Sequence, residues 1–338
     1  MNIFLTYCTI SDKHMTSRFV KPVNAIRSGY SYIMSSILRK PFISGMPVSV
    51  SAELTNYCNL RCPECASGSE IIKRERGFMD IELYNKLISE LSPYLYFINL
   101  YFQGEPMMHP QFFSFAGLND TINTVVSTNG HFLSVENSEK LAVSHLKRLI
   151  VSLDGMDQEI YSIYRRNGDF RKVVDGIKNV ASAIVRHNSP LKLEIQFLVN
   201  RHNEHQIPEA ECFAKEIGAR LKLKSMQIIS SQDAEEWMPA DRKFRRYKKS
   251  DGSYVIKSSL PDSCMRLFSN PVITWDGKVI PCCFDKDAEF VMGDLNNETF
   301  KSIWNGQRYN EFRKKILTGR NKMDICRNCT SGLRGVRY

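Results

Sequence analysis

From about residue 49 onward, the chain alternates short apolar runs with amphipathic stretches of helical period. Apolar runs rich in β-branched and aromatic residues predict strands buried on both faces, whereas apolar residues recurring every three to four positions predict helices. The predicted strands are 48–54, 96–102, 122–127, 148–153, 191–199 and 220–229. The predicted helices between them are 80–91, 111–118, 136–145, 157–164, 170–187 and 207–217. Six β–α units in a row predict an α/β fold, in which helices cover a parallel sheet.

Further regions flank this unit of residues 49–230. Residues 1–48 form a basic extension with a predicted helix near 20–39, in which one face carries Val23, Ile26, Tyr30, Ile33 and Ile37. We expect this stripe to pack against the rest of the protein, with contact to a membrane surface as the alternative. Residues 231–262 are polar and charged, which predicts a linker with a loop, and residues 263–338 form a compact cysteine-containing module.

The distribution of charge favours an anionic partner. The net charge is +10, residues 1–48 carry six Lys or Arg against one Asp, and a second basic run covers residues 242–249. Such patches suit a phosphorylated substrate, nucleic acid or a membrane surface, although a solvated basic face is the simpler explanation. The chain has no long apolar run and no secretory signal, which predicts no transmembrane segment and a cytoplasmic location.

Ten cysteines are unusual for a chain without an export signal. In a reducing compartment, clustered cysteines indicate metal ligands or catalytic groups rather than disulfides. Cys58, Cys62 and Cys65 fall within eight residues, just after the first predicted strand. Soft thiolate ligands select iron–sulfur clusters or zinc, but a structural zinc site would need a fourth ligand, and none is near in the sequence. By contrast, Cys8 and Cys212 stand alone and are expected to be small buried residues.

The spacing C-x3-C-x2-C after the first strand of an α/β repeat resembles the radical S-adenosylmethionine (SAM) superfamily. The resemblance implies a partial (β/α)6 barrel and a four-iron cluster on Cys58, Cys62 and Cys65. It also implies that SAM binds the open iron, that one electron cleaves the sulfonium, and that the resulting 5′-deoxyadenosyl radical takes hydrogen from a substrate. The protein would then be an oxidoreductase or epimerase that receives its electrons from a donor such as flavodoxin or ferredoxin.

The resemblance extends to polar positions after the later strands. Gly104-Glu105-Pro106 looks like the family's GEP motif, whose backbone and glutamate side chain engage the amino group of SAM. Arg165 matches a basic residue that pairs with the SAM carboxylate. Four further positions match residues that contact SAM: Ser127, Asn129, Ser152 and Gln196, with Asn203 as a later polar position. A turn or helix-capping role is the alternative for each residue taken singly.

The cysteine module resembles the SPASM/twitch extension of the same family, because Cys264, Gly277 and Cys282 form a C-x12-G-x4-C pattern. The resemblance implies one auxiliary four-iron cluster on Cys264, Cys282, Cys326 and Cys329. A four-thiolate zinc site fits the spacing nearly as well. Cys283 is then unassigned: it could replace Cys282 as a ligand, be a buried thiol, or donate a hydrogen atom to a substrate radical.

The substrate class stays open at the level of sequence. SPASM-type enzymes modify peptides or small molecules, and residues 1–48 lack the strand pattern of a peptide-recognition domain, which favours a small or carrier-linked substrate. A peptide delivered by a separate protein is the alternative. Asp154 and the basic run at 242–249 could touch the substrate or be structural. A different class is a non-enzymatic zinc or iron–sulfur module that binds nucleic acid through its basic patches.

Overall fold

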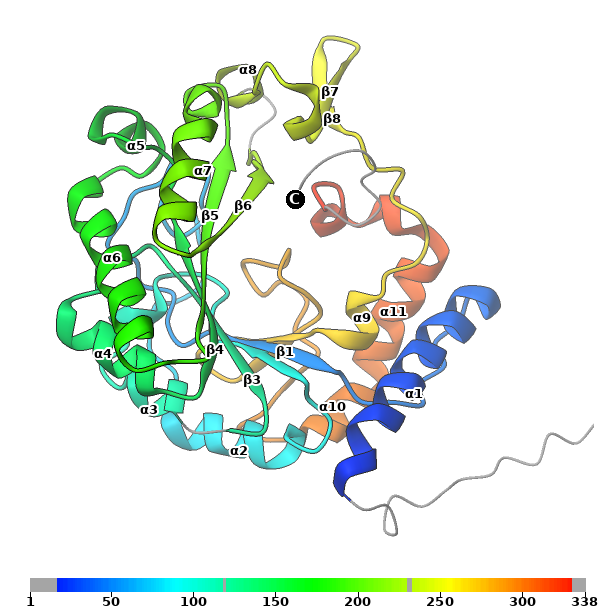
Figure 1. Cartoon of the computed structure of the whole chain (residues 1–338). Coiled ribbons are helices and arrows are strands. Elements are labelled where there is room, and N and C mark those ends of the chain that lie inside the picture. Colours follow the sequence, from blue (N-terminus) through cyan, green and yellow to red (C-terminus); the bar gives the residue numbers. More distant parts are fainter. Residues whose placement is uncertain (1–16, 118–119, 230–232, 330–338) are drawn as a thin grey trace, which may run out of the picture.

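The computed structural model describes residues 17–117, 120–229 and 233–329, which form an open barrel around a nine-stranded sheet (Figure 1). The strand order is β11-β10-β9-β1-β2-β3-β4-β5-β6. The first six strands are all parallel to their neighbours: β1 (Ser49–Ala52), β2 (Phe97–Asn99), β3 (Asn123–Thr128), β4 (Leu146–Ser152), β5 (Lys192–Val199) and β6 (Arg220–Ser225). This arrangement confirms the predicted α/β fold.

Helices cover the outside of the parallel strands (Figure 1). They are α2 (Ile81–Leu91), α3 (Phe112–Gly117), α4 (Val135–Val143), α5 (Gln158–Tyr164), α6 (Phe170–Arg186) and α7 (Ile207–Glu216). Aspartate or serine side chains cap several of their N-termini, as Asp80 does for α2 and Ser134 for α4. The longest of these helices, α6, buries Val173, Ile177 and Val180 against the sheet.

The two faces of the strands differ in polarity. Val50, Ile98 and Val126 point outward into the main hydrophobic core beneath the helices. Since side chains alternate along a strand, the opposite face carries the barrel interior, and there Asn99 donates to the hydroxyl of Ser51 at 3.3 Å. Other interior positions are Arg148, Glu194, Gln196, Lys222 and Lys224. The expectation of strands apolar on both faces is therefore wrong for the interior face, which carries these charged and polar side chains on β4, β5 and β6.

The C-terminal module continues the barrel sheet. β9 (Val272–Ile273) pairs in parallel with β1, and β10 (Lys278–Ile280) and β11 (Gly293–Asp294) follow as antiparallel strands. The turn between β9 and β10 uses Gly277 at φ +88°, where glycine is favoured. The helices of the module are α9 (Arg266–Ser269), α10 (Phe300–Asn305) and α11 (Gln307–Gly319), followed by the short helices η5 (Arg320–Lys322) and η6 (Asp324–Cys326).

The segment expected to be a linker is largely structured in its described part. It contains α8 (Ala234–Trp237), η4 (Arg242–Phe244) and a hairpin of β7 (Tyr247–Ser250) and β8 (Ser253–Ile256). Trp237, Met238 and Tyr247 are buried in a second hydrophobic cluster together with Leu60 and Cys62 of the cysteine loop. This segment is rich in charged residues. Its few large apolar residues nevertheless pack against the cysteine loop.

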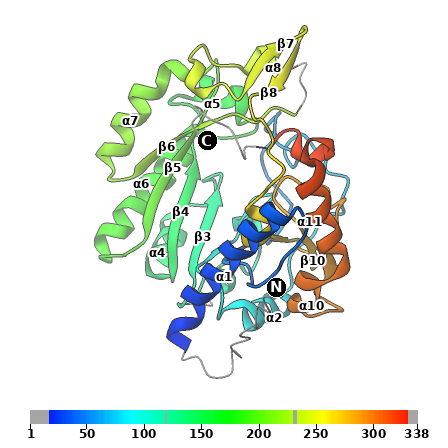
Figure 2. The same ribbon diagram turned by 90° about the vertical axis from the view of Figure 1, so that its right-hand side faces the viewer.

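Helix α1 (Ser17–Leu38) packs on the module through an unexpected face (Figure 2). Its buried residues are small and polar: Ser28 is 1% exposed and donates to the carbonyl of Phe268, and Asn24 bonds to both backbone groups of Met46. The predicted packing of the apolar stripe is wrong for four of its five members, since the exposed large residues include Ile26, Tyr30, Ile33 and Ile37, which are 48–72% exposed. No helix in the described ranges is long and apolar enough to cross a membrane.

Candidate active site

The cysteine loop lies just beyond the C-terminal end of β1, where its backbone is held by short contacts. The Arg61 amide donates to the Arg166 carbonyl at 3.0 Å, and the Ser69 amide donates to the Cys65 carbonyl at 2.8 Å. Burial, with a smaller contribution from the neighbouring thiolates, raises the pKa of Cys58 to about 11 and that of Cys62 to about 12. Without a metal these thiols are protonated at neutral pH, so cluster binding must release protons.

The loop offers a donor set that suits a cluster better than a single ion. Within residues 17–117, 120–229 and 233–329, no three His, Cys, Asp or Glu side chains are arranged to hold one metal ion. The thiols of an iron–sulfur cluster bind separate irons, so they stand further apart than the ligands of one ion. Cys58, Cys62 and Cys65 are all free and close enough to interact electrostatically, which fits the larger group.

Gly104 brings the GEP motif into direct contact with the cysteine loop. Its φ is +74°, and a Cβ there would lie 2.5 Å from the Thr55 carbonyl oxygen and 2.6 Å from that of Tyr57. The Gly104 amide donates to the Ser67 hydroxyl at 2.9 Å, and the next amide, of Glu105, donates to the Tyr57 carbonyl at 2.7 Å. Both the conformation and the space require glycine at this position.

The Glu105 side chain points into the protein. It is 2% exposed, and its carboxylate accepts hydrogen bonds from the Thr128 hydroxyl at 2.7 Å and the Asn129 amide at 2.6 Å. Burial raises its pKa to about 7. A side-chain contact to SAM stays a prediction; in the structure this carboxylate orients Asn129, whose Nδ2 donates to Asn59 at 2.8 Å and lies 3.9 Å from the Cys58 sulfur.

Arg165 reaches the loop from the end of α5. Its Nη1 lies 3.9 Å from the Cys62 sulfur, and its Nε donates to Asp154 at 2.6 Å. Asp154 is 1% exposed and also accepts from the Leu198 amide, contacts that favour the structural alternative. Asn203 stabilises the backbone of Asp154, because its Nδ2 donates to the Asp154 carbonyl at 3.0 Å. Pairing of Arg165 with a SAM carboxylate stays a prediction.

Three further predicted residues lie on the interior face of the barrel, near the ends of β3, β4 and β5. Ser152 and Gln196 are paired across β4 and β5, and Ser127 stands one strand away on β3. Together with Asn129 and Arg165 they offer hydroxyl, amide and guanidinium groups at the end of the barrel that carries the cysteine loop. Strand ends of parallel sheets converge at one edge, which explains why residues so far apart in sequence come together.

The second cysteine group is buried in the C-terminal module. The exposed fractions of Cys264, Cys282, Cys326 and Cys329 are 4–8%, and Arg320 Nη2 lies 3.2 Å from the Cys329 sulfur. Burial raises the pKa of Cys326 to about 11, while the Arg320 guanidinium opposes the shift. The identity of the ligands stays a prediction. Of the isolated cysteines, Cys212 is exposed, contrary to expectation, and Cys8 lies outside the described residues.

Cys283 lies beside this group, since the charge of Cys329 acts on it, and it also contacts Arg266. Arg266 Nη1 lies 3.0 Å from its sulfur, and its charge acts on Tyr101 at the end of β2. Burial raises the pKa of the Cys283 thiol, and Arg266 opposes this shift. Whether this thiol donates hydrogen, replaces Cys282 as a ligand or is only buried stays open.

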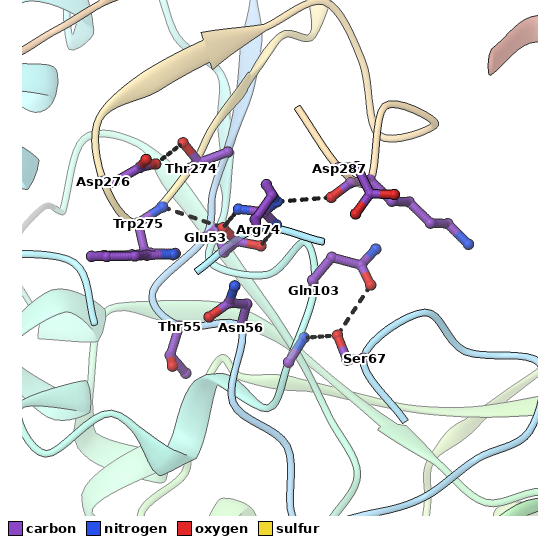
Figure 3. A network of polar contacts seen from close by, with 12 residues as sticks. Glu53, Thr55, Asn56, Ser67, Arg74, Gln103, Thr274, Trp275, Asp276 and Asp287 are labelled. Atoms are coloured by element: carbon purple, nitrogen blue, oxygen red, sulfur yellow. Dashed lines mark hydrogen bonds and ion pairs between the residues drawn. The ribbon is translucent and has the colours of Figure 1, made fainter. Parts of the chain in front are cut away.

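Sequence reasoning missed a buried ion pair that joins the loop after the cysteines to the module (Figure 3). Arg74 binds both oxygens of Glu53, at 2.7 and 2.8 Å, and the Glu53 side chain is fully buried. The Trp275 amide donates to the same carboxylate at 3.3 Å, and Arg74 Nε donates to the Lys286 carbonyl at 2.9 Å. The only available sequence signal was an acidic residue directly following an apolar strand.

An open parallel barrel with a three-cysteine loop at its strand ends, and a second cysteine group beside it, defines an iron–sulfur enzyme of the SAM-cleaving type. Residues 52–195 match the family model of the radical SAM superfamily, and residues 264–330 match that of the SPASM iron–sulfur cluster-binding domain. The chain belongs to the radical SAM superfamily. Its cofactors are accordingly a four-iron cluster, SAM and auxiliary iron–sulfur, and a non-enzymatic nucleic-acid-binding module is not favoured.

Known relatives agree with this assignment. Mycofactocin maturase MftC of Mycobacterium tuberculosis is 28% identical over 299 residues, covering 81% of this chain and 74% of the relative. MftC of Mycobacterium ulcerans is 29% identical over 194 residues, a match that covers 56% of this chain and 50% of that protein. The SAM-dependent 2-deoxy-scyllo-inosamine dehydrogenase of Niallia circulans is 22% identical over 289 residues, covering 83% of this chain and 92% of the relative.

Among solved structures, Streptococcus suis SuiB bound to SAM has the same fold, with a TM-score of 0.62 at 13% identity, covering 93% of this chain and 79% of SuiB. Another SuiB structure, at a TM-score of 0.60, holds the precursor peptide SuiA.

Proposed function

We propose that Cys58, Cys62 and Cys65 hold the catalytic four-iron cluster and that the chain takes hydrogen from a substrate held in the barrel interior. When bound, the cluster and SAM supply the 5′-deoxyadenosyl radical. The observation that carries the assignment is the convergence of Asn129 and Arg165 on this loop, each 3.9 Å from a cysteine sulfur. Donors this close to thiolates stabilise their charge and are positioned to orient a polar cofactor beside them.

The chain's own residues orient the reactants and exclude water. Gly104 and Glu105 fix the cysteine loop and Asn129 relative to each other. Trp237 and Met238 pack with Leu60 of the cysteine loop and form an apolar cover. Such a cover would keep solvent from a reactive radical. Ser127, Ser152 and Gln196 face the interior, where they are available to hydrogen-bond SAM or the substrate.

The experiment compares iron content and SAM cleavage in matched variants purified without oxygen. The wild type should bind about eight irons and form 5′-deoxyadenosine with a strong reductant. Combined replacement of Cys58, Cys62 and Cys65 by Ala should remove about four irons and abolish 5′-deoxyadenosine, because the thiolates are the cluster ligands. Replacement of Cys326 and Cys329 should remove the other four. Cys212→Ala, on exposed α7, is the control and should change neither quantity.

Reductive cleavage of SAM by the triple variant would contradict the assignment of the loop. Stoichiometric zinc in place of iron at the C-terminal module would contradict the auxiliary cluster alone. Since iron–sulfur proteins are brown and absorb near 400 nm while zinc proteins are colourless, the visible spectrum gives an independent measure of both outcomes.

Two overall reactions are compatible with this site. A net oxidation would pass the substrate electron to the auxiliary cysteine group, and one relative is a dehydrogenase. An epimerisation would return a hydrogen atom from Cys283, which lies beside Arg266 and near Tyr101. We propose a small or carrier-linked substrate, because the interior is lined by polar side chains. A ferredoxin or flavodoxin is the proposed electron donor, and the cytoplasm, which keeps thiols reduced, is the proposed location.

Helix α1 carries a further proposal, namely contact with an anionic membrane surface. Its exposed apolar residues recur at helical spacing and form one stripe: Phe19, Ile26, Tyr30, Ile33 and Ile37. The helix contains no Asp or Glu, and exposed Lys40 follows it. An apolar stripe flanked by cations is the pattern of helices that lie in the headgroup region of anionic bilayers.

Vesicle co-sedimentation tests this surface. The full chain should bind vesicles that contain phosphatidylglycerol and not those of phosphatidylcholine alone, and binding should be lost in the double variant Ile26→Glu/Ile33→Glu. Val185→Glu is the matched control, because Val185 is 81% exposed on α6, away from the stripe. Absence of binding by the wild type would overturn the proposal. So would a lipid-independent dimer that the double variant dissociates, since the stripe would then bind a second copy.

A further inference from the structure

We propose that His131 is a positioning residue for the catalytic cluster. It holds the Asn129 side chain in the orientation that directs an N–H toward the Cys58 sulfur, and it thereby raises the reduction potential of the cluster. The inference rests on the proposed function, because it assumes that Cys58 is a ligand of that cluster. Both ring nitrogens of His131 are hydrogen-bonded, one to Asn129 and the other to the backbone of Asp169.

The Asn129 side chain uses all of its hydrogen-bonding capacity. Its Nδ2 donates to the Asn59 Oδ1 at 2.8 Å and toward the Cys58 sulfur at 3.9 Å. Its Oδ1 accepts from the His131 backbone amide at 3.0 Å and lies 3.1 Å from the His131 Nδ1. A rotation of the amide group by half a turn would place its N–H groups against both of these nitrogens, so the contacts with His131 fix which end of Asn129 faces the cysteine.

The tautomer of His131 follows from its second partner. The Asp169 backbone amide donates to Nε2 at 2.9 Å, and because a backbone amide can only donate, Nε2 carries the lone pair. In the neutral ring the proton is then on Nδ1, which donates it to the Asn129 Oδ1. Burial lowers the pKa of His131, which keeps the ring neutral near pH 7.

The turn after β3 packs closely against α6, and this packing places the ring. Gly130 has a φ of +87°, and a Cβ there would lie 2.9 Å from Cγ1 of Val173 on α6. Asp169, whose amide binds the ring, is the N-cap residue of the same helix. His131 is buried, so water competes little for its ring nitrogens. The ring is therefore held between the start of α6 and Asn129.

Hydrogen bonds to the sulfurs of a cluster affect its reduction potential. Such bonds stabilise the reduced state more than the oxidised state, because reduction adds negative charge to the cluster. The Cys58 sulfur accepts from the Leu60 amide at 3.5 Å as well as from Asn129. The Leu60 contact belongs to the backbone of the loop, whereas the Asn129 amide group can rotate. Loss of its anchor at His131 would therefore weaken the contact with Cys58 and lower the potential.

A simpler explanation is that His131 only joins the turn to α6. Its removal would then lower the free energy of unfolding and leave the reduction potential unchanged. His109 is the matched case, because it is equally buried and its ring nitrogens contact the Met79 carbonyl and the Gln111 amide, each at 3.0 Å. Replacement of His109 removes two similar hydrogen bonds, neither of which involves Asn129.

A redox titration of the anaerobically reconstituted full chain, followed by electron paramagnetic resonance, tests the proposal. The signal of the loop cluster is the one that the triple cysteine variant lacks, and the auxiliary signal is an internal control. Asn129→Ala should make reduction of the loop cluster about tenfold less favourable, which is a shift of about 59 mV to more negative potential. His131→Leu should give about a threefold effect, since the backbone amide of residue 131 remains. His109→Leu should give none.

Two amide replacements separate the contacts of the ring. The side-chain amide of His131→Asn lies near the position of Nδ1, whereas that of His131→Gln lies near the position of Nε2. The potential of His131→Asn should therefore stay closer to that of the wild type. In the double variant His131→Leu/Asn129→Ala the shift should equal that of Asn129→Ala alone, because His131 acts through Asn129.

An unchanged loop potential in His131→Leu, an equal shift in His109→Leu, or additive shifts in the double variant would overturn the proposal. If His131→Leu fails to bind iron, the amide replacements decide the outcome, and a potential nearer to the wild type in His131→Gln than in His131→Asn would overturn it. Each of these results leaves the proposed function standing. The proposed function itself fails if the triple cysteine variant retains both cluster signals, because Cys58 would then not be a ligand.

Discussion

Cys282 and Cys283 are adjacent in the chain and share part of their surroundings. The charges of Cys283, Cys264 and Cys329 act on Cys282, which is 8% exposed, whereas Cys283 contacts Arg266, is acted on by Cys329 and acts on Tyr101. The pair lies in a turn after β10, in which the Asp285 amide donates to the Cys282 carbonyl at 3.2 Å. Which of the two thiols is a cluster ligand stays a prediction.

We expect Cys282→Ala to lose about four irons and Cys283→Ala to lose none, because only the former removes a cluster ligand. Iron analysis and the visible spectrum after anaerobic reconstitution measure the difference. The reverse result would make Cys283 the ligand. With a substrate in hand, turnover in deuterated water completes the test: loss of solvent deuterium incorporation in Cys283→Ala would support hydrogen donation, and an unimpaired variant would end it.

At the level of elements, the segment after the cysteine loop links the end of β1 to the hairpin of β9 and β10 through hydrogen bonds and an ion pair. Glu53 directly follows β1, Arg74 lies in the segment after the cysteine loop, and Trp275 lies in the turn between β9 and β10 (Figure 3). The Trp275 ring nitrogen also donates to the Glu75 carbonyl at 3.2 Å, and the Lys73 amide donates to Asp287 at 2.8 Å. These contacts join the hairpin of β9 and β10, and the turn after it, to residues 73–75, which follow the cysteine loop.

Arg74→Met should lower the free energy of unfolding by about 3 kcal/mol, because it leaves the Glu53 carboxylate buried without its cation. Arg76→Met is the matched control. Arg76 pairs with half-exposed Glu70 at 3.5 Å, and such a surface pair contributes roughly 1 kcal/mol or less. Anaerobic denaturant unfolding of the loaded protein measures both. Equal losses in the two variants would show that the Glu53–Arg74 pair has no special structural role.

The whole molecule is built around one continuous sheet and one main core. β9 extends the barrel sheet at β1, and the core that contains Val50 and Ile98 also contains Ile273, Trp304 and Tyr309 of the module. Helix α1 is tied to the same module through Ser28 and Phe268. The barrel and the module therefore share one sheet and one core.

The sequence by itself determined the class of protein and most of the strands. Three thiols within eight residues, a GEP segment after the second strand and a repeated β–α pattern are local features, and their chemistry does not depend on distant contacts. The interior positions of Ser127, Ser152 and Gln196 follow from strand periodicity in the same way, since side chains alternate along a strand.

Only the tertiary structure decided which partners these residues meet. Arg165 binds Asp154 and Glu105 binds Asn129 because strand ends converge after the barrel forms. The stripe of α1 was expected to be buried, but the helix packs through its serines, because hydrogen bonds to Phe268 and Phe42 select that face. Periodicity predicts which side chains share a face, whereas the partner of that face depends on long-range packing.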